Sequence, residues 1–416
     1  LAADREEGNY WRDVRRVRNL HTYEVEPRKA GEDRYRPLDH FSPERWQAFR
    51  RDVVALQTQM RPRSWRGVFT DRGYNPPPFW TFVGQRLTAF LPASSIAALK
   101  VLTVLDLLFL ALTFWLIRRT FGPRPALLVL LFLTLSPVNT GRFVGGFLQY
   151  DWFCTIAAGV CWLRQRKPVP AAAALAYATM TRVFPLFLVG SMRIAAVAIW
   201  VRSGKLRRRD LRFGVTFALF CLMALGLGSL TGRGPGAWKE FVDNISHHTE
   251  EHTYGERRIG LKHVFTHDLA SFGFDEEVAE RRETFVRQHT AYQGAAALGL
   301  LAFALAVVRR RDHRALLLGL IPLFLLTVSS RYYWSCLALV PLAGFGESTL
   351  QRRRLDLTQG LLFGAYYLFA FLRPDRYGAY SFLNLLLVAF LGLLLGYELK
   401  RSWRAHRRLA VRRGRP

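Results

Sequence analysis

The sequence predicts an all-α polytopic membrane protein with an extracytoplasmic helical cap. Three observations support this fold class. Half of the 416 residues are hydrophobic, the apolar segments are separated by short arginine-rich loops, and two long polar stretches interrupt them at residues 1–78 and 232–292. A spanning helix needs about 20 largely apolar residues. We therefore expect about 11 transmembrane helices, or 12 if another helix precedes Leu1.

The expected spans follow one another from residue 98 to residue 399, and several are short enough to be tilted or re-entrant. They cover residues 98–117, 125–145, 150–163, 170–182, 183–201, 213–231, 293–308, 315–330, 333–347, 357–373 and 380–399. The predicted organisation is a first extracytoplasmic loop with interfacial helices (1–97), transmembrane helices (98–231), an extracytoplasmic loop (232–292), further transmembrane helices (293–399) and a basic cytoplasmic tail (400–416).

The charge distribution predicts the orientation. The chain has 59 Lys+Arg against 31 Asp+Glu, and the basic residues cluster where apolar runs end. Basic loops of membrane proteins face the cytoplasm. Alternate crossings that start with residues 1–97 outside place every arginine cluster and the C-terminus in the cytoplasm, and both polar stretches outside. A multi-pass protein of the cell membrane, such as a bacterial inner membrane, is expected. No nucleic-acid partner is expected, since no nucleic-acid-binding motif accompanies the charge.

The cysteines and the chain start give two smaller expectations. All four cysteines lie within apolar segments, and their spacing fits no zinc site, so neither disulfides nor a metal site is expected. They are Cys154, Cys161, Cys221 and Cys336. The first residue is Leu1 rather than Met, so we expect a fragment or a processed chain with a membrane helix upstream.

The region before the first span is expected to fold as a small helical cap. Residues 10–20 and 43–60 have helical patterns, and Ser42-Pro43-Glu44 supplies a capping serine and a proline at the first helical position. Residues 79–92 are apolar but too short to cross a bilayer. Their aromatic residues and Arg86 are typical of a helix lying in the membrane interface.

A cluster of carboxylates stands near the start of the chain, in Asp4-Arg-Glu-Glu-Gly-Asn-Tyr-Trp-Arg-Asp13. A carboxylate held beside a membrane is partly desolvated, so it can accept a proton from a hydroxyl near neutral pH. The alternative is a solvated helix start, where Asp and Glu favour the first turn.

A proline-rich element follows in Arg72-Gly-Tyr-Asn-Pro-Pro-Pro-Phe-Trp80, where three prolines exclude a regular helix and form a rigid elbow. This Tyr-Asn-x-Pro-Pro element leads into an aromatic interfacial helix and lies some 60 residues after an acidic-x-x-Tyr element. In this combination the chain resembles the GT-C superfamily of membrane glycosyltransferases. Later segments, 146–152 and 176–185, are similar to its mannosyltransferase-like bacterial branch.

The resemblance implies a polyprenyl-phosphate sugar donor and a catalytic Asp or Glu in the first extracytoplasmic loop. The acidic element of the superfamily often reads Asp-Glu-x-x-Tyr, and Glu6-Glu-Gly-Asn-Tyr10 fits it with Glu in place of Asp. The catalytic base is then one of Asp4, Glu6 and Glu7. The matched motifs place Tyr10, Tyr74 and Asn75 at the substrate.

Two ionisable residues, Asp106 and Arg182, lie within expected spans. Such residues are costly in hydrocarbon unless they face a partner or a wet cavity, so each is either functional or part of a buried structural pair. Asp151 stands at the outer end of its span. It faces the same side as the N-terminal carboxylates and is expected to position an acceptor or to act as a second acid.

The loop 232–292 supplies cations on the expected outer face. A lipid-phosphate leaving group needs cations and hydrogen-bond donors to take its developing charge. Arg257, Arg258, Lys262 and His263 provide them, and Arg331 returns to the same face between two spans. The alternatives are a solvated amphipathic helix with paired charges for the loop and an interfacial aromatic belt around Arg331.

These features predict an enzyme that transfers one sugar from a polyprenyl-phosphate donor to a hydroxyl of a lipid, glycan or protein acceptor on the extracytoplasmic side. No cofactor is expected to be required, although a divalent cation is possible. One alternative is a transporter or flippase of a lipid-linked or anionic substrate, but the chain shows no internal repeat. Another is a zinc protease built on His248-Thr-Glu-Glu-His252, for which no third ligand is evident.

Overall fold

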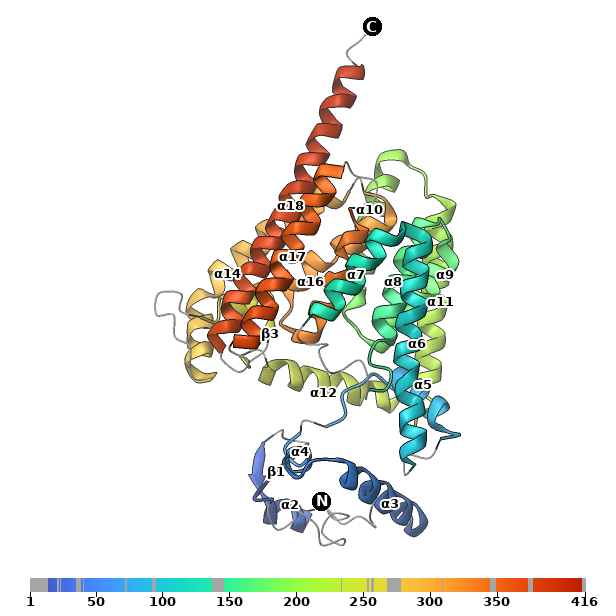
Figure 1. Ribbon diagram of the computed structural model, residues 1–416, viewed down its shortest axis with the longest axis vertical. Helices are drawn as coiled ribbons and strands as arrows, with labels where there is room; N and C mark the ends of the chain where they lie inside the picture. The colour runs from blue at the N-terminus through green and yellow to red at the C-terminus, as the bar shows by residue number, and fades with distance from the viewer. Residues whose placement is uncertain are drawn as a thin grey trace. The chain divides into compact units, whose positions relative to one another are not determined.

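The computed structural model is predominantly helical (Figure 1). This confirms the all-α class; in the described residues, strands form two short two-stranded ribbons. The structure describes residues 14–20, 22, 24–34, 39, 41–71, 73–91, 95–136, 146–232, 234–252, 254–255, 258–267, 278–308, 310–344, 349–372 and 377–413.

The chain divides into two compact units. Unit 1 comprises Leu1–Leu105 and Leu227–His248, and unit 2 comprises Asp106–Gly226 and Thr249–Pro416. The boundaries fall inside helices α6 (Ile96–Phe121), α11 (Arg208–Gly228) and α12 (Gly236–His252). The two units are described separately below.

Unit 1 contains a short ribbon where the sequence predicted a helix. Strand β1 (Arg16–Arg18) pairs antiparallel with β2 (Val25–Pro27), with Val17 opposite Glu26. The prediction of a helix over residues 10–20 is therefore wrong for this part. Val17 is buried whereas Arg16 is exposed, which is the alternation of a strand with one covered face.

The helices that lie wholly within unit 1 are α2 (Arg28–Arg34), α3 (Pro43–Gln59), α4 (Pro62–Val68) and α5 (Pro78–Thr88), and the last three begin at prolines. The sequence predicted such a start for α3 and a helix after the proline elbow for α5. The predicted cap of α3 is confirmed, since Ser42 Oγ accepts a hydrogen bond of 3.3 Å from the Arg45 amide. At Gly228 a Cβ would stand 2.6 Å from Trp238 and 2.9 Å from the Phe79 nitrogen, so only glycine permits this packing.

Among the described residues, five helices are long and apolar enough to cross a membrane by length and composition. They are α6, α10 (Pro185–Ser203), α11, α14 (Val278–Val307) and residues 380–403 of α18 (Tyr377–Arg413); α7 (Pro123–Leu135) is a shorter apolar helix. Many of their leucines and valines are exposed, as expected for surfaces that face lipid. These helices support a multi-pass membrane protein, although not the full number of spans expected from the sequence.

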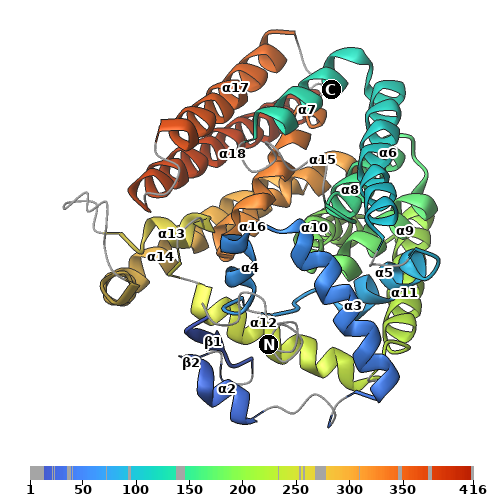
Figure 2. The same ribbon diagram turned by 60° about the horizontal axis from the view of Figure 1, so that its bottom comes forward.

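Several other expected spans, which the criteria of length and composition do not confirm, coincide with short helices that are largely buried within unit 2. They are α8 (Asp151–Arg164), α9 (Pro168–Thr181), α15 (Asp312–Leu318), α16 (Leu320–Leu326) and the 3-10 helix η3 (Arg331–Leu342). Figure 2 shows α15 and α16 among α8, α10 and α14, which they contact. At Gly319 a Cβ would lie 2.5 Å from the Leu188 Cα, so the glycine between α15 and α16 allows close packing on α10.

The remaining elements of unit 2 pack against α18 or lie near its first residues. Helix α17 (Thr349–Leu372) lies along α18, and α14 contacts α18 as well (Figure 1). Strand β3 (Arg258–Ile259) pairs antiparallel with β4 (Ser329–Ser330), and α13 (Leu261–Val264) follows β3. The ribbon therefore joins the polar loop 232–292 to the segment that leads into η3.

Candidate functional site

Asp106 joins α6 to the start of α8. Its side chain is buried, and its two carboxylate oxygens accept hydrogen bonds of 3.0 Å from the amides of Gln149 and Tyr150. These amides precede α8, so the carboxylate caps that helix from a neighbouring one. The preceding Leu148 has φ 50°, a left-handed conformation that costs about 1–2 kcal/mol outside glycine. Asp106 thus holds a strained turn in place, and it forms no ion pair with Arg182 in the described structure.

Asp151 is the first residue of α8, and its carboxylate is 3% exposed. Tyr177 of α9 donates its hydroxyl to Oδ2 at 3.0 Å, and the Trp152 amide donates to Oδ1 at 2.7 Å. A buried carboxylate is costly unless it is hydrogen-bonded. Both donors come from the α8–α9 hairpin, so this acid is held rigidly at one end of two packed helices.

Arg182 follows α9 and faces the same place. Its guanidinium carbon lies 5.8 Å from the centre of the Tyr332 ring, and its charge acts on both Asp151 and Tyr177. Its Nε is buried, and in the described part of the chain its side chain has no hydrogen-bond partner. A guanidinium has five N–H donors and pairs readily with phosphate oxygens. Arg182 therefore keeps donors available for a bound anion.

Aromatic rings form one wall of this site. Trp152 lies 5.3 Å from Phe184, and Phe184 lies 4.1 Å from Tyr333, between ring centres. Tyr332 contacts both Tyr333, at 4.4 Å, and Trp152, at 6.2 Å. Such rings exclude water and strengthen nearby electrostatic interactions.

The β3–β4 ribbon brings two predicted cations together. Arg258 Nη1 donates to Ser330 Oγ at 2.6 Å, and Arg331 Nη1 donates to the Tyr380 hydroxyl at 3.5 Å. Asn384 of α18 holds the ribbon, because its Oδ1 accepts from the Gly260 amide at 2.7 Å and its Nδ2 donates to the Arg258 carbonyl at 2.9 Å. Arg331 directly precedes Tyr332, so the ribbon is continuous with the Arg182 site.

Lys262 and His263 lie one turn beyond the ribbon. The Lys262 ammonium stands 4.7 Å from the centre of the Phe285 ring, and burial lowers its pKa. His263 is fully buried, and burial together with His267, Arg281 and Arg258 holds its pKa well below the usual value. His263 is therefore uncharged at neutral pH, so it can offer a hydrogen bond but no positive charge.

An apolar pocket of about 240 Å³ lies among α6, α7 and α8. Leu107, Leu110 and Phe114 of α6 line it together with Phe153 of α8. Leu107 is next to the capping Asp106, and Phe153 is two residues from Asp151. The pocket thus uses the same stretches of α6 and α8 as Asp106 and Asp151, although residues one and two positions apart on a helix point to different faces.

The model of glycosyltransferase family 87 matches residues 74–330, which is more than half of the chain. The chain belongs to glycosyltransferase family 87. The match includes Asp106, Asp151, Arg182 and Arg258. This GT-C-like membrane family confirms the resemblance inferred from the sequence. None of the curated proteins and none of the solved structures matches the chain.

The family 87 match begins at Tyr74, in the proline elbow. Tyr74 and Asn75 belong to unit 1, where the Tyr74 hydroxyl lies 2.9 Å from Thr81 Oγ1 of α5. The other predicted site residues divide between those in unit 2 and those that lie outside the described residues. The former are Asp151, Arg258, Lys262, His263 and Arg331, and the latter are Asp4, Glu6, Glu7, Tyr10 and Arg257.

Sequence reasoning gave no role to Tyr177, Tyr332 or the apolar pocket of this glycosyltransferase. The available signal was Arg182, a cation inside an apolar segment, which marks a partner or a ligand nearby. The described residues contain no group of three metal-binding side chains. The side chains of His248 and His252, on which the protease alternative depends, lie outside the described residues.

Proposed function

We propose that this family 87 glycosyltransferase transfers a single sugar from a polyprenyl-phosphate donor to a hydroxyl of a lipid, glycan or protein acceptor on the extracytoplasmic side. One observation carries the proposal: the buried Arg182 Nε has no hydrogen-bond partner in the described residues, and the Arg182 charge acts on the buried Asp151–Tyr177 pair. A free guanidinium donor suits a phosphate, and the apolar pocket among α6, α7 and α8 suits a hydrocarbon chain.

In this mechanism Arg182 holds the donor phosphate. As the bond from the anomeric carbon to the phosphate oxygen breaks, negative charge develops on that oxygen, and a preorganised guanidinium stabilises it. Arg258 and Arg331 on the adjoining ribbon, together with Arg257 and Lys262, add positive charge. His263, neutral by burial, donates or accepts a hydrogen bond.

The apolar pocket receives part of the hydrocarbon chain of the donor. Burial of hydrocarbon contributes about 0.8 kcal/mol for each CH₂ removed from water. Within a bilayer this gain is small, because lipid is also apolar. The pocket therefore acts mainly by orientation, since it fixes the direction from which the phosphate approaches Arg182.

The base belongs to the Asp4, Glu6 and Glu7 group. It removes the proton of the acceptor hydroxyl while the hydroxyl oxygen attacks the anomeric carbon and the polyprenyl phosphate leaves. A single displacement inverts the configuration at that carbon. Asp151 is the alternative base; in the leading mechanism it instead accepts a hydrogen bond from the acceptor and keeps Tyr177 in place.

The test incubates the full chain, in detergent or reconstituted vesicles, with polyprenyl-phosphate sugars that carry a radiolabel in the sugar. The proposal predicts covalent transfer of the label. A Glu6→Gln, Glu7→Gln double variant is expected to abolish transfer while it still folds and inserts, and Asp151→Asn is expected to retain part of the activity. The reverse pattern would assign the base to Asp151. Passage of label across the membrane without product would support the transporter alternative instead.

A further inference from the structure

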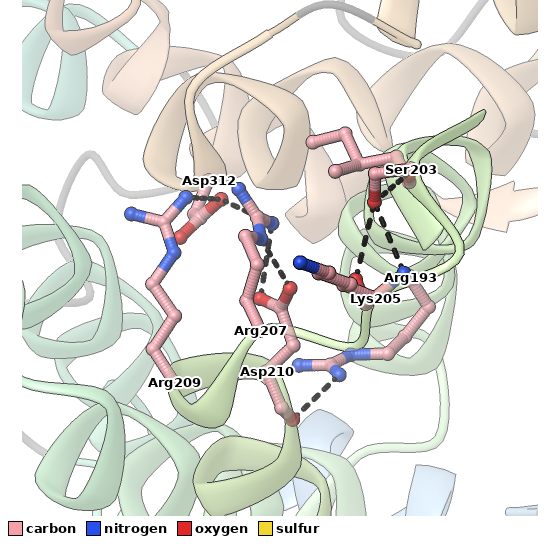
Figure 3. A network of polar contacts seen from close by, with 8 residues as sticks. Arg193, Ser203, Lys205, Arg207, Arg209, Asp210 and Asp312 are labelled. Atoms are coloured by element: carbon pink, nitrogen blue, oxygen red, sulfur yellow. Dashed lines mark hydrogen bonds and ion pairs between the residues drawn. The ribbon is translucent and has the colours of Figure 1, made fainter. Parts of the chain in front are cut away.

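A second polar cluster lies where the arginine-rich loops meet unit 2, between the α8–α9 turn, α10, α11 and α15 (Figure 3). Its two carboxylates are already paired. Arg207 contacts Asp210 through two donors, at 2.5 and 3.0 Å, and Arg209 lies 3.5 Å from Asp312. Arg207 also lies 3.7 Å from Asp312, and the two contacts to Asp312 fix the start of α11 against the start of α15.

Three further cations line the same pocket and form no ion pair within 4 Å in the described structure: Arg166, Lys167 and Arg193. The charge of Arg193 nevertheless interacts with Asp210 and Asp312. Arg193 donates to the Asp210 carbonyl at 3.1 Å, and its guanidinium carbon lies 4.4 Å from the centre of the Phe213 ring. Its Nε is buried and has no hydrogen-bond partner there. Five cations thus surround two carboxylates, and the positive charge exceeds the negative.

The α8–α9 turn holds Arg166 in a strained backbone conformation. Arg166 has φ 61°, and the bonds from the Arg166 amide to the Leu163 carbonyl and from the Lys167 amide to the Trp162 carbonyl define a helix end that usually carries glycine at this position. A side chain there costs about 1–2 kcal/mol. The turn nevertheless carries two exposed cations at the mouth of the pocket.

The surroundings of the pocket are apolar and exposed. Arg193, Val197 and Trp200 share one face of α10 at positions i, i+4 and i+7, and Val197 and Trp200 are each about half exposed. Exposed aliphatic and tryptophan side chains beside a basic cluster are typical of surfaces at a membrane interface. A ligand of this pocket would therefore reach it from the membrane rather than from bulk water.

We propose that this pocket binds the phosphate of an anionic phospholipid in the leaflet that contacts the arginine-rich loops. The space of about 20 Å³ admits one small polar group such as a phosphate oxygen. Arg193 lines this space, and Arg166 and Lys167 hold the remaining phosphate oxygens at its mouth. Guanidinium groups suit this role because they are weakly hydrated and bind phosphate through paired N–H donors.

The experiment uses the full chain in nanodiscs of phosphatidylcholine, with and without phosphatidylglycerol, and measures retained lipid by native mass spectrometry together with Tm. The test variant combines Arg166→Gly with Lys167→Gln, because glycine suits the left-handed turn and preserves the fold. The matched control combines Arg353→Gln with Arg354→Gln, two exposed arginines of α17. Wild type and control should retain phosphatidylglycerol and gain Tm from it.

The test variant should bind phosphatidylglycerol about ten- to hundredfold more weakly, since it loses two charge-assisted contacts and each is worth about 1.4 kcal/mol at most. Equal retention by wild type and test variant would overturn the proposal. An equal loss of bound phosphatidylglycerol in the test and control variants would also overturn the proposal. The lipid would then respond to the total positive charge of the protein surface and not to this pocket. A Tm gain from inorganic phosphate in phosphatidylcholine nanodiscs as large as that from phosphatidylglycerol would assign the pocket to a soluble anion.

Discussion

Two arginine sites of unit 2 differ in whether a carboxylate pairs with the arginine. In the first, Glu398 of α18 binds two arginines: the Arg310 Nε lies 2.6 Å from Oε2, and the Arg314 Nε donates to Oε1 at 2.9 Å. Arg310 also donates to Ser402 Oγ at 2.7 Å. Glu398 is fully buried, and both arginines are less than a tenth exposed. This site, the Glu398 cluster, joins α15 to α18.

In the second site, Arg182 contacts one aromatic ring and has no hydrogen-bonded acid in the described residues. The carboxylate beside it, Asp151, is occupied by Tyr177 and the Trp152 amide. The same residue type thus has two roles. An arginine that is ion-paired with a buried acid stabilises the fold, whereas Arg182, which forms no ion pair in the described residues, keeps its charge for a ligand.

The largest expected effect comes from breaking the Glu398 cluster. Glu398→Gln leaves two buried guanidiniums without a counter-charge, and loss of one partner from a buried pair costs about 3–5 kcal/mol. Denaturant unfolding in detergent measures this loss. Asp356→Asn, at the partly exposed pair with Arg124, is the control and should cost about 1 kcal/mol or less. Equal losses of unfolding free energy in the two variants would show that the Glu398 cluster stabilises the fold no more than a partly exposed ion pair does.

The next effect concerns catalysis. Arg182→Gln removes the cation proposed to stabilise the leaving phosphate, and loss of one such donor lowers the rate about 10²–10³-fold. Transfer from a labelled donor measures kcat/KM, and Tm should stay near that of the wild type. Arg212→Gln, which removes an exposed charge of α11, should leave kcat/KM unchanged. A rate loss in both variants would point to general charge rather than to Arg182.

A smaller effect is expected at the ribbon that holds Arg258. Asn384→Leu leaves the Gly260 amide and the Arg258 carbonyl without their partner, which costs about 1–3 kcal/mol. It should also raise the KM for the donor. Gln359→Leu is the control, because it removes a buried bond to the Leu337 carbonyl away from the ribbon. It should lower stability while KM stays constant, so a rise in KM for both variants would dismiss the ribbon as a donor site.

The smallest effect is a pH dependence of stability from His267. Burial and Arg281 lower its pKa to about 4 from the ordinary 6.5. As the pH falls below 6.5, His267 binds a proton in the unfolded chain but not in the folded chain. The contribution of neutral His267 to the free energy of unfolding is therefore complete above pH 6.5 and decreases toward pH 4. Tm should fall over this range, and less so in His267→Gln than in the exposed control His289→Gln. Identical pH slopes in the two variants would remove His267 as a cause.

Much of the fold was predictable because it depends on local chemistry. Ser42 caps α3 as its sequence indicates, and the prolines at 43 and 78 start helices. The number of spans was not predictable. Helices α8 and α16 have the apolar composition of membrane spans, but other helices cover them. An apolar segment in a sequence does not indicate whether protein or lipid surrounds it.

The candidate site was predictable only where charge interrupts apolar sequence. Asp151 and Arg182 were conspicuous for this reason, and the loop cations Arg258 and Arg331 meet at one ribbon in the structure. Tyr177 and Tyr332 carried no such signal, because a tyrosine in an apolar segment is usually a packing residue. The apolar pocket arises from three helices whose mutual placement no short motif encodes.

The central claim is that Arg182 serves a ligand whereas Glu398 serves the fold, and one paired measurement tests it most directly. Arg182→Gln and Glu398→Gln are purified side by side, and single-turnover transfer and Tm are measured on each. We expect Arg182→Gln to lose transfer by about 10²–10³-fold at a wild-type Tm. Glu398→Gln should lose Tm while its folded fraction transfers at the wild-type rate. Wild-type transfer by Arg182→Gln, or a loss that only follows its Tm, would contradict the account.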